Sequence, residues 1–330
     1  MPTLDVFTGN AFNTISLTNA INKLPYKEGR IKSLGIFSPK GVRTRNVMVE
    51  EKAGVLRILS NLPWGSPAQQ NVPQKRTVRS FSCAHFALAD AVMADDVQDL
   101  RVFGQETGEQ AVSSKVNEKM GEMKQDHEIT QEYLMAGALQ GVIKDGAGTT
   151  LYNLFTEFGV SEQSVDLTLA SAGTKGKILD VKRAVETTLG AIPFDHVHCI
   201  CGSTLFQSFI QDDEVKAAYE RYQDGAFLRT DQRRGFDFCG VIFEEYPGQV
   251  GSTTFLPATE FRAFPVGAPN LFQMIYAPAD YMETVNTVGQ PYYAKQRRME
   301  FDRGIELETQ SNPLPMCMIP AACVKITSST

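Results

Sequence analysis

Two histidines and two cysteines alternate between His196 and Cys201, and imidazoles and thiolates are common ligands of zinc. If all four side chains converged on one ion, the chain would be a cytosolic metal enzyme. In a strand, however, successive side chains point to opposite faces, so His196 and His198 share one face while Cys199 and Cys201 share the other. No Asp or Glu motif at ligand spacing accompanies them. We interpret 196–201 as a buried strand without a metal.

Ser203 follows that strand in the sequence Gly202-Ser203-Thr204, where a nucleophile or a phosphate could stand. Neither a G-x-S-x-G nor a G-x-x-x-x-G-K-[ST] pattern is present there, so Ser203 is predicted to be the N-cap of the next helix. His127 falls on the apolar stripe of a long predicted helix, which favours a hydrogen-bonded structural histidine.

The numbers of charged residues and the spacing of the cysteines exclude further classes of function. Lys and Arg number 32 against 38 Asp and Glu, a net charge of -6, which argues against a dedicated nucleic-acid binder. The six cysteines are scattered without C-x-x-C pairing and are expected to be free thiols. A basic cluster near Asp231 could bind an anion, but a solvated loop or an intersubunit ion pair is favoured; its members are Arg229, Arg233 and Arg234. We assign no catalytic, cofactor-binding or metal-binding residue and expect no cofactor.

Length and composition indicate a globular protein: 330 residues and 42% hydrophobic content are enough for one large or two ordinary domains. No basic start followed by an apolar run, and no stretch of 18 apolar residues, predicts secretion or membrane spanning. We expect a protein made in a reducing cytosol.

The first third of the chain is predicted to be extended. Residues 1–30 are rich in turn-forming residues and show no sustained helical or strand periodicity, so they are predicted to form an extended arm. Strand-like runs at 42–50, 54–59 and 77–88 form one long hairpin, whose irregular tip begins at Leu62 and contains Trp64, the chain's only tryptophan. An aromatic residue in such a loop indicates a protein contact.

A long helix follows the hairpin. Thr107 and Gln110 form a capping box, and an apolar stripe runs from Val112 until Asp145-Gly146 stops it, which predicts a structural spine of about 50 Å. Beyond it, 149–158 and 165–169 are predicted to be paired strands. An α/β group comes next, with helices at 180–189, 203–210 and 213–222 and strands at 197–201 and 236–246; strands 255–264 and 272–276 are expected to join its sheet. The tail, 304–326, is expected to be extended.

Several short blocks, in order along nearly the whole chain, resemble the major capsid protein E family of lambda-like tailed phages, which has the Hong Kong 97-type capsid fold. The blocks are Ile129-Thr130 with Glu132, Asp145-Gly146, Leu151-Tyr152-Asn153-Leu154-Phe155, Phe158-Gly159, Cys201-Gly202-Ser203, Leu205-Phe206, Val215, Tyr276-Ala277-Pro278-Ala279-Asp280, Glu283-Thr284-Val285-Asn286 and Gln310-Ser311-Asn312-Pro313-Leu314-Pro315.

The resemblance implies an α+β fold with an N-terminal arm (1–30), an extended loop hairpin with flanking strands (31–100), a peripheral domain with spine helix and hairpin (101–178), an α/β axial domain (179–300) and a returning peripheral strand (301–330). It implies a non-enzymatic major capsid protein of the virion, assembled in the host cytoplasm into pentamers and hexamers around double-stranded DNA that it does not read by sequence. Besides the chain itself, scaffold, portal and decoration or cement proteins are the expected partners, with no membrane. The absence of a long acidic or coiled N-terminal segment points to a separate scaffold. An encapsulin-like protein compartment and the cytosolic metal enzyme are the alternatives.

Overall fold

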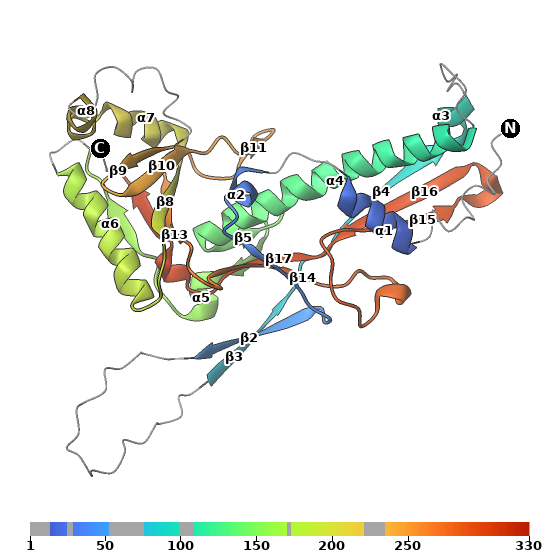
Figure 1. Cartoon of the computed structure of the whole chain (residues 1–330), viewed down its shortest axis with the longest axis horizontal. Helices are drawn as coiled ribbons and strands as arrows, with labels where there is room; N and C mark the ends of the chain where they lie inside the picture. Colours follow the sequence, from blue (N-terminus) through green and yellow to red (C-terminus); the bar gives the residue numbers. More distant parts are fainter. Residues whose placement is uncertain are drawn as a thin grey trace, which may run out of the picture.

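The computed structural model describes residues 14–24, 29–52, 76–98, 108–169, 173–220 and 235–329. The predicted hairpin tip with Trp64, the Thr107 cap and the Arg229 cluster lie outside these residues. Figure 1 shows an elongated molecule: a sheet covered by helices lies at one end, a long helix runs to the other, and a hairpin projects from the body.

The long helix α4 (Gly108–Gln140) confirms the predicted spine. It ends earlier than expected, because Gly141 takes a left-handed φ of 77° and the chain turns into a short strand. That strand, β5 (Val142–Lys144), pairs with β6 (Thr150–Asn153) around a turn in which the Asp145 carboxylate accepts from the Thr149 amide at 2.8 Å. The apolar spacing at 139–143 had extended the predicted helix across this turn.

The sheet beneath the N-terminal half of α4 is antiparallel, with the order β15 (Tyr293–Arg298), β16 (Gly304–Ser311) and β4 (Phe86–Met93). The predicted extended arm is wrong in part, because Thr14–Lys23 forms helix α1 against β15 and α4. Leu17 and Ile21, one turn apart, are buried there with Val116 and Met120 of α4. Tertiary burial of one face stabilises a helix too short to persist alone.

The hairpin is confirmed: β2 (Asn46–Lys52) pairs with β3 (Arg76–Ser82), and it extends away from the body in Figure 1. The predicted pairing of 149–158 with 165–169 is wrong. Asn153 caps a helix, α5 (Leu154–Phe158), by accepting from the Phe155 and Thr156 amides at 3.1 and 3.3 Å. β7 (Ser164–Asp166) instead pairs with the C-terminal strand β18 (Val324–Thr327).

The α/β group is a six-stranded sheet, in which β8 (His196–Cys201) lies between β13 (Phe261–Val266) and β10 (Val241–Glu245), and β9 (Phe236–Phe238) lies at one edge. The single strand predicted at 236–246 is a hairpin, because Cys239 and Gly240 take positive φ values of 56° and 76°. Helices α6 (Thr174–Leu189), α7 (Ser203–Gln211) and α8 (Asp213–Glu220) accompany the sheet, as Figure 1 shows.

Two further predictions about this region are corrected. Ser203 is the first helical residue of α7, and Gly202 is the N-cap, where an added Cβ would lie 2.3 Å from the Pro257 carbonyl oxygen. β14 (Phe272–Tyr276) is not in the six-stranded sheet; it lies between β1 (Ser38–Gly41) and β17 (Pro313–Cys317) in a separate sheet. Its partners come from opposite ends of the chain, which local sequence does not reveal.

Short elements complete the described chain: α2 (Arg30–Ser33), α3 (Ala94–Gln98), β11 (Gln249–Val250), β12 (Thr253–Thr254), and the 3-10 turns η5 (Met282–Thr284), η6 (Glu300–Asp302) and η7 (Pro320–Ala322). The extended tail is confirmed, since β16, β17 and β18 all lie in it. Within the described ranges, no helix has the length and hydrophobicity needed to cross a bilayer.

Candidate functional site

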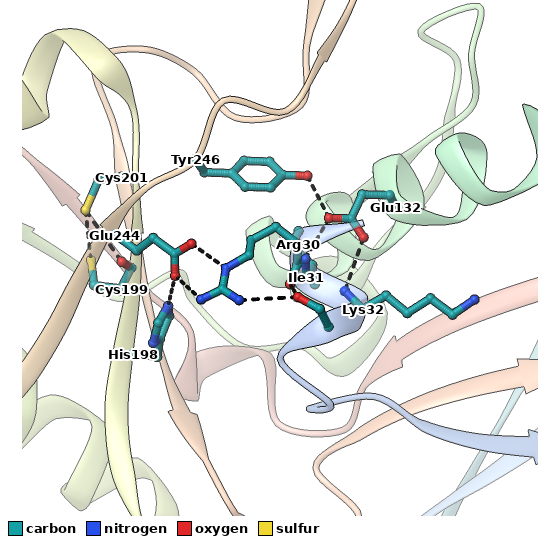
Figure 2. Close-up of polar contacts among 10 residues, drawn as sticks. Arg30, Ile31, Lys32, Glu132, His198, Cys199, Cys201, Glu244 and Tyr246 are labelled. Atoms are coloured by element: carbon teal, nitrogen blue, oxygen red, sulfur yellow. Dashed lines mark hydrogen bonds and ion pairs between the residues drawn. The ribbon is translucent and has the colours of Figure 1, made fainter. Parts of the chain in front are cut away.

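A group of ionisable side chains, most of them buried, lies where α2, α4 and β10 meet. We call it the α2 joint and define it as Arg30, Ile31 and Lys32 of α2, Glu128 and Glu132 of α4, and His198, Glu244 and Tyr246 of the six-stranded sheet region. Figure 2 shows α2 between the sheet on one side and α4 on the other, with carboxylates pointing to it from both. Three segments far apart in the sequence are therefore joined by ion pairs and by hydrogen bonds to carboxylates.

Glu132 binds the N-terminus of α2. Its carboxylate, on a residue only 5% exposed, accepts from the Ile31 amide at 2.6 Å, the Lys32 amide at 3.2 Å and the Tyr246 hydroxyl at 3.1 Å. Gly29, the N-cap residue, has no side chain to do this, and an added Cβ would lie 2.3 Å from Glu132 Oε2. Burial raises the pKa of Glu132, although the three hydrogen bonds favour the charged form. A carboxylate from another helix thus caps α2.

Glu244 binds α2 from the other side. Arg30 donates to both oxygens of Glu244, with Nη2 at 2.8 Å, and Nε2 of His198 lies 3.3 Å from Oε2. Burial alone would raise the pKa of Glu244, but the neighbouring His198 and the hydrogen bonds from Arg30 outweigh it and hold that pKa below its ordinary value. The hydrogen bond between Arg30 and Glu244 also raises the pKa of Arg30. The pairing is bidentate, which fixes the orientation of α2 against β10.

Lys32 and Glu128 extend the joint along α4. Lys32 Nζ donates to Glu128 at 2.7 Å, and the Tyr292 hydroxyl donates to the other oxygen of that carboxylate. Lys124, one turn earlier on α4, donates to the Leu24 carbonyl at 2.8 Å, and its ammonium lies 5.4 Å from the Tyr292 ring centroid. Burial lowers the pKa of Lys124. Leu24, just after α1, and Lys32 of α2 are therefore both bound to α4.

The adjoining side of the same stretch of α4 binds the sheets. His127 is buried, with Nε2 3.0 Å from the Thr309 hydroxyl of β16, and burial lowers its pKa to about 4. Gln131 donates to Ser311 at 3.0 Å and accepts from the Tyr276 hydroxyl at 3.1 Å. His127 is thus neutral and hydrogen-bonded, in agreement with its interpretation as a structural histidine.

The His196 to Cys201 segment shows the predicted alternation. The Sγ atoms of Cys199 and Cys201 lie 3.9 Å apart on one face of β8, and His198 faces Glu244 on the other. All six cysteines are free thiols. Across the described ranges, no three His, Cys, Asp or Glu side chains are grouped as ligands of one metal ion.

The α2 joint holds segments together. Its ionisable groups donate to and accept from one another or from backbone groups of a different segment, so the arrangement fixes the N-terminal segment to the spine helix and the sheet. A groove of about 400 Å³ borders it, lined by residues that include Arg30, Glu128, Ile129 and Val250.

Sequence reasoning missed the joint. Its visible signal was a set of polar residues at helical spacing that continues the apolar stripe of the spine helix: Lys124, His127, Glu128, Gln131 and Glu132.

A profile of the family described as "phage major capsid protein E" matches residues 13–328, almost the whole described chain. The chain belongs to this family. The family's members form phage head shells, so the protein is a structural, shell-forming component of the virion, as the resemblance implied.

Individual relatives agree with this assignment. The chain is 24% identical to the major capsid protein of Salmonella phage Felix O1 over 96% of each chain, and 26% identical to that of Pseudomonas phage KPP10 over 96% of this chain and 97% of the other. A prophage protein of E. coli CFT073, described as a candidate capsid protein, superposes with a TM-score of 0.57 at 14% identity, covering 96% of this chain and 99% of that one. The fold is the expected α+β Hong Kong 97-type capsid fold.

Proposed function

We propose that this chain assembles into pentamers and hexamers that close into an icosahedral head shell around double-stranded phage DNA. The family match across residues 13–328, on an elongated fold with a projecting hairpin, carries the proposal. Many modest interfaces, each repeated around the shell, sum to a stable container.

The β2–β3 hairpin is proposed to lie over a neighbouring subunit. Its register places Met48 opposite Ser80 and Val78 opposite Glu50, so both apolar side chains share one face of the hairpin. Met48 is 74% and Val78 55% exposed. Apolar side chains on a two-stranded arm that leaves the body gain little from their own subunit, and a neighbour that covers them would bury this surface.

Replacing Leu62 to Gln74 with a short Gly-Ser linker tests this contact. The variant is expected to fold with near-normal circular dichroism but to form no closed shells, or shells that dissociate at lower denaturant. Replacing the exposed residues Gly146 and Ala147 of the β5–β6 turn with Gly-Ser provides a control for loop changes in general. Normal, equally stable particles from the linker variant would show that residues 62–74 have no part in the contact between subunits.

We propose that the protein is not an enzyme and that a separate scaffold, a portal and decoration proteins act with it during assembly in the host cytoplasm. The domain division proposed above, with a peripheral region around α4 and an axial region around the six-stranded sheet, is consistent with the described sheets. A net charge of -6 suits the wall of a DNA container that does not hinder packing.

The contents of the shell separate this proposal from a protein compartment of encapsulin type. Particles purified from infected cells should contain nuclease-protected double-stranded DNA and bind external DNA only weakly at physiological salt. Particles that enclose a cargo protein instead of DNA would overturn the proposed contents while leaving shell formation intact.

A further inference from the structure

A cavity of about 290 Å³ lies at the base of the β2–β3 hairpin, where the two strands leave the body of the molecule (Figure 1). Part of its lining comes from Arg43 and Arg45, just before β2, and from Cys83 to His85, just after β3. The rest comes from the loop that follows β14 and from Asn312, which follows β16. The cavity therefore lies between the hairpin and the body.

Two guanidinium groups of this lining have no partner within the described part of the chain. Arg43 and Arg45 are exposed, and neither forms an ion pair or a side-chain hydrogen bond there. Arg262 and Arg297, in contrast, each donate to a carboxylate. Of the described residues that line the cavity, Asp280 alone has a carboxylate. The lining is therefore positively charged, although the whole chain is negative.

His85 lines the same cavity, and Asn312 fixes its tautomer. Asn312 is 4% exposed and donates through Nδ2 to the Pro278 carbonyl at 2.7 Å. Its Oδ1, 2.8 Å from Nδ1 of His85, must then accept from the imidazole. Nδ1 carries the proton of the neutral ring, so Nε2 is the nitrogen that gains a proton and can then donate to an anion.

The backbone around the cavity is held by hydrogen bonds between distant segments. The Val42 amide donates to the Tyr276 carbonyl at 2.9 Å, and the Val42 carbonyl accepts from the Gly289 amide at 2.8 Å. The Arg45 carbonyl accepts from the Cys83 amide at 3.0 Å. A ligand would therefore have to order the arginine side chains but not the backbone that carries them, which lowers the entropic cost of binding.

We propose that this cavity binds a doubly charged oxyanion of the phosphate class. The guanidinium groups of Arg43 and Arg45 match the oxygens of a tetrahedral anion, and protonated His85 adds a third donor. Two guanidinium groups and one imidazolium, less the carboxylate of Asp280, leave a charge of +2. A dianion neutralises this charge, whereas a monocarboxylate neutralises half of it. The inference goes beyond shell formation and does not depend on it.

Isothermal titration calorimetry of the purified full-length chain with sodium sulfate tests the site, because sulfate keeps its double charge from about pH 5.5 to about pH 8. One sulfate should bind per chain with a Kd on the order of 1 mM at about pH 5.5. Binding should weaken toward pH 8 as His85 loses its proton, and His85→Gln should remove this dependence. Cys83 keeps its proton throughout, because burial raises the pKa of its thiol to about 11.

Substitutions separate the site from general charge effects. Arg43→Gln and Arg45→Gln should each weaken sulfate binding about tenfold or more. Their melting temperatures should stay within about 2 °C of the wild type, because both side chains are exposed. Asp280→Asn removes the opposing charge and should strengthen binding. Arg183→Gln makes the same change at an exposed arginine of α6 outside the cavity and should leave binding unchanged.

Three results would overturn the proposal: no saturable sulfate binding, an equal loss in Arg183→Gln, or equally tight binding of acetate. Competition with sulfate then distinguishes two sources of the phosphate group. Displacement by inorganic phosphate alone identifies free phosphate as the ligand, whereas displacement also by a short single-stranded oligonucleotide identifies the phosphodiesters of DNA. If neither displaces sulfate, the assignment to the phosphate class is wrong.

Discussion

Changing Glu132 to Gln tests whether the α2 joint fixes the N-terminal segment. Oε1 of Glu132 accepts from the Ile31 amide and the Tyr246 hydroxyl, and Oε2 accepts from the Lys32 amide. A glutamine has only one acceptor oxygen. If that oxygen takes the place of Oε1, the side-chain NH₂ meets the Lys32 N–H, and two donors face each other.

The cost follows from those contacts. Loss of one charge-assisted hydrogen bond and an unsatisfied buried amide would destabilise the protein by about 2–3 kcal/mol. Removal of a buried charge offsets part of this, because the raised pKa of Glu132 shows that burial disfavours its ionised form. We expect the free energy of unfolding to fall by about 1–2 kcal/mol.

Urea unfolding measures the change, and amide hydrogen exchange locates it. The Ile31 and Lys32 amides should exchange faster in Glu132→Gln, while amides of the six-stranded sheet keep their protection. Glu122→Gln, an exposed position on the same helix, should change stability by less than about 0.5 kcal/mol. If Glu132→Gln retains wild-type stability and wild-type protection at 31 and 32, the carboxylate does not cap α2 and the reasoning is refuted.

Three further predictions use the same structure. Gly29→Ala should cost about 1–2 kcal/mol in urea unfolding, because its Cβ would lie 2.3 Å from Glu132 Oε2, whereas Gly146→Ala, with nothing within 4 Å, should be nearly neutral; equal effects would contradict this. The pKa of Glu244 is lowered in the folded state, so the stability that its charged form contributes is complete above the ordinary Glu pKa of about 4.3 and is lost as the pH falls through the lowered value. The difference in unfolding free energy between wild type and Glu244→Gln should therefore narrow from about pH 6 to about pH 3. A difference that stays constant over this range would count against the ion pair. Ile21→Ala, fully buried on α1, should cost about 2–4 kcal/mol, and the exposed Ile15→Ala less than about 0.5 kcal/mol, in thermal or urea unfolding; similar values would show that α1 does not dock as described.

Sequence patterns predicted those elements whose signals are local. The spine helix, the β8 strand and the helices after it followed from hydrophobic periodicity, and the alternation of His198 with Cys199 and Cys201 followed from strand geometry. The hairpin between 46 and 82 was also visible, because extended runs flank a segment rich in proline and glycine.

Predictions failed where distant segments decide local structure. Thr14–Lys23 becomes helical because Leu17 and Ile21 pack against a surface made by β15 and α4. Thr18, for example, contacts Ala294 of β15, which is 276 residues away in the sequence. β14 joins β1 and β17 for a similar reason. The α2 joint combines Arg30, Glu132 and Glu244, whose spacing along the chain carries no pattern that brings them together.

Electron microscopy and sedimentation velocity of the purified full-length chain test the central claim most directly. The account predicts closed particles of uniform diameter, built from fivefold and sixfold clusters of the chain, in equilibrium with free subunits at low concentration. A protein that remains a monomer or a small oligomer at every concentration, with and without co-expressed phage assembly proteins, would contradict it.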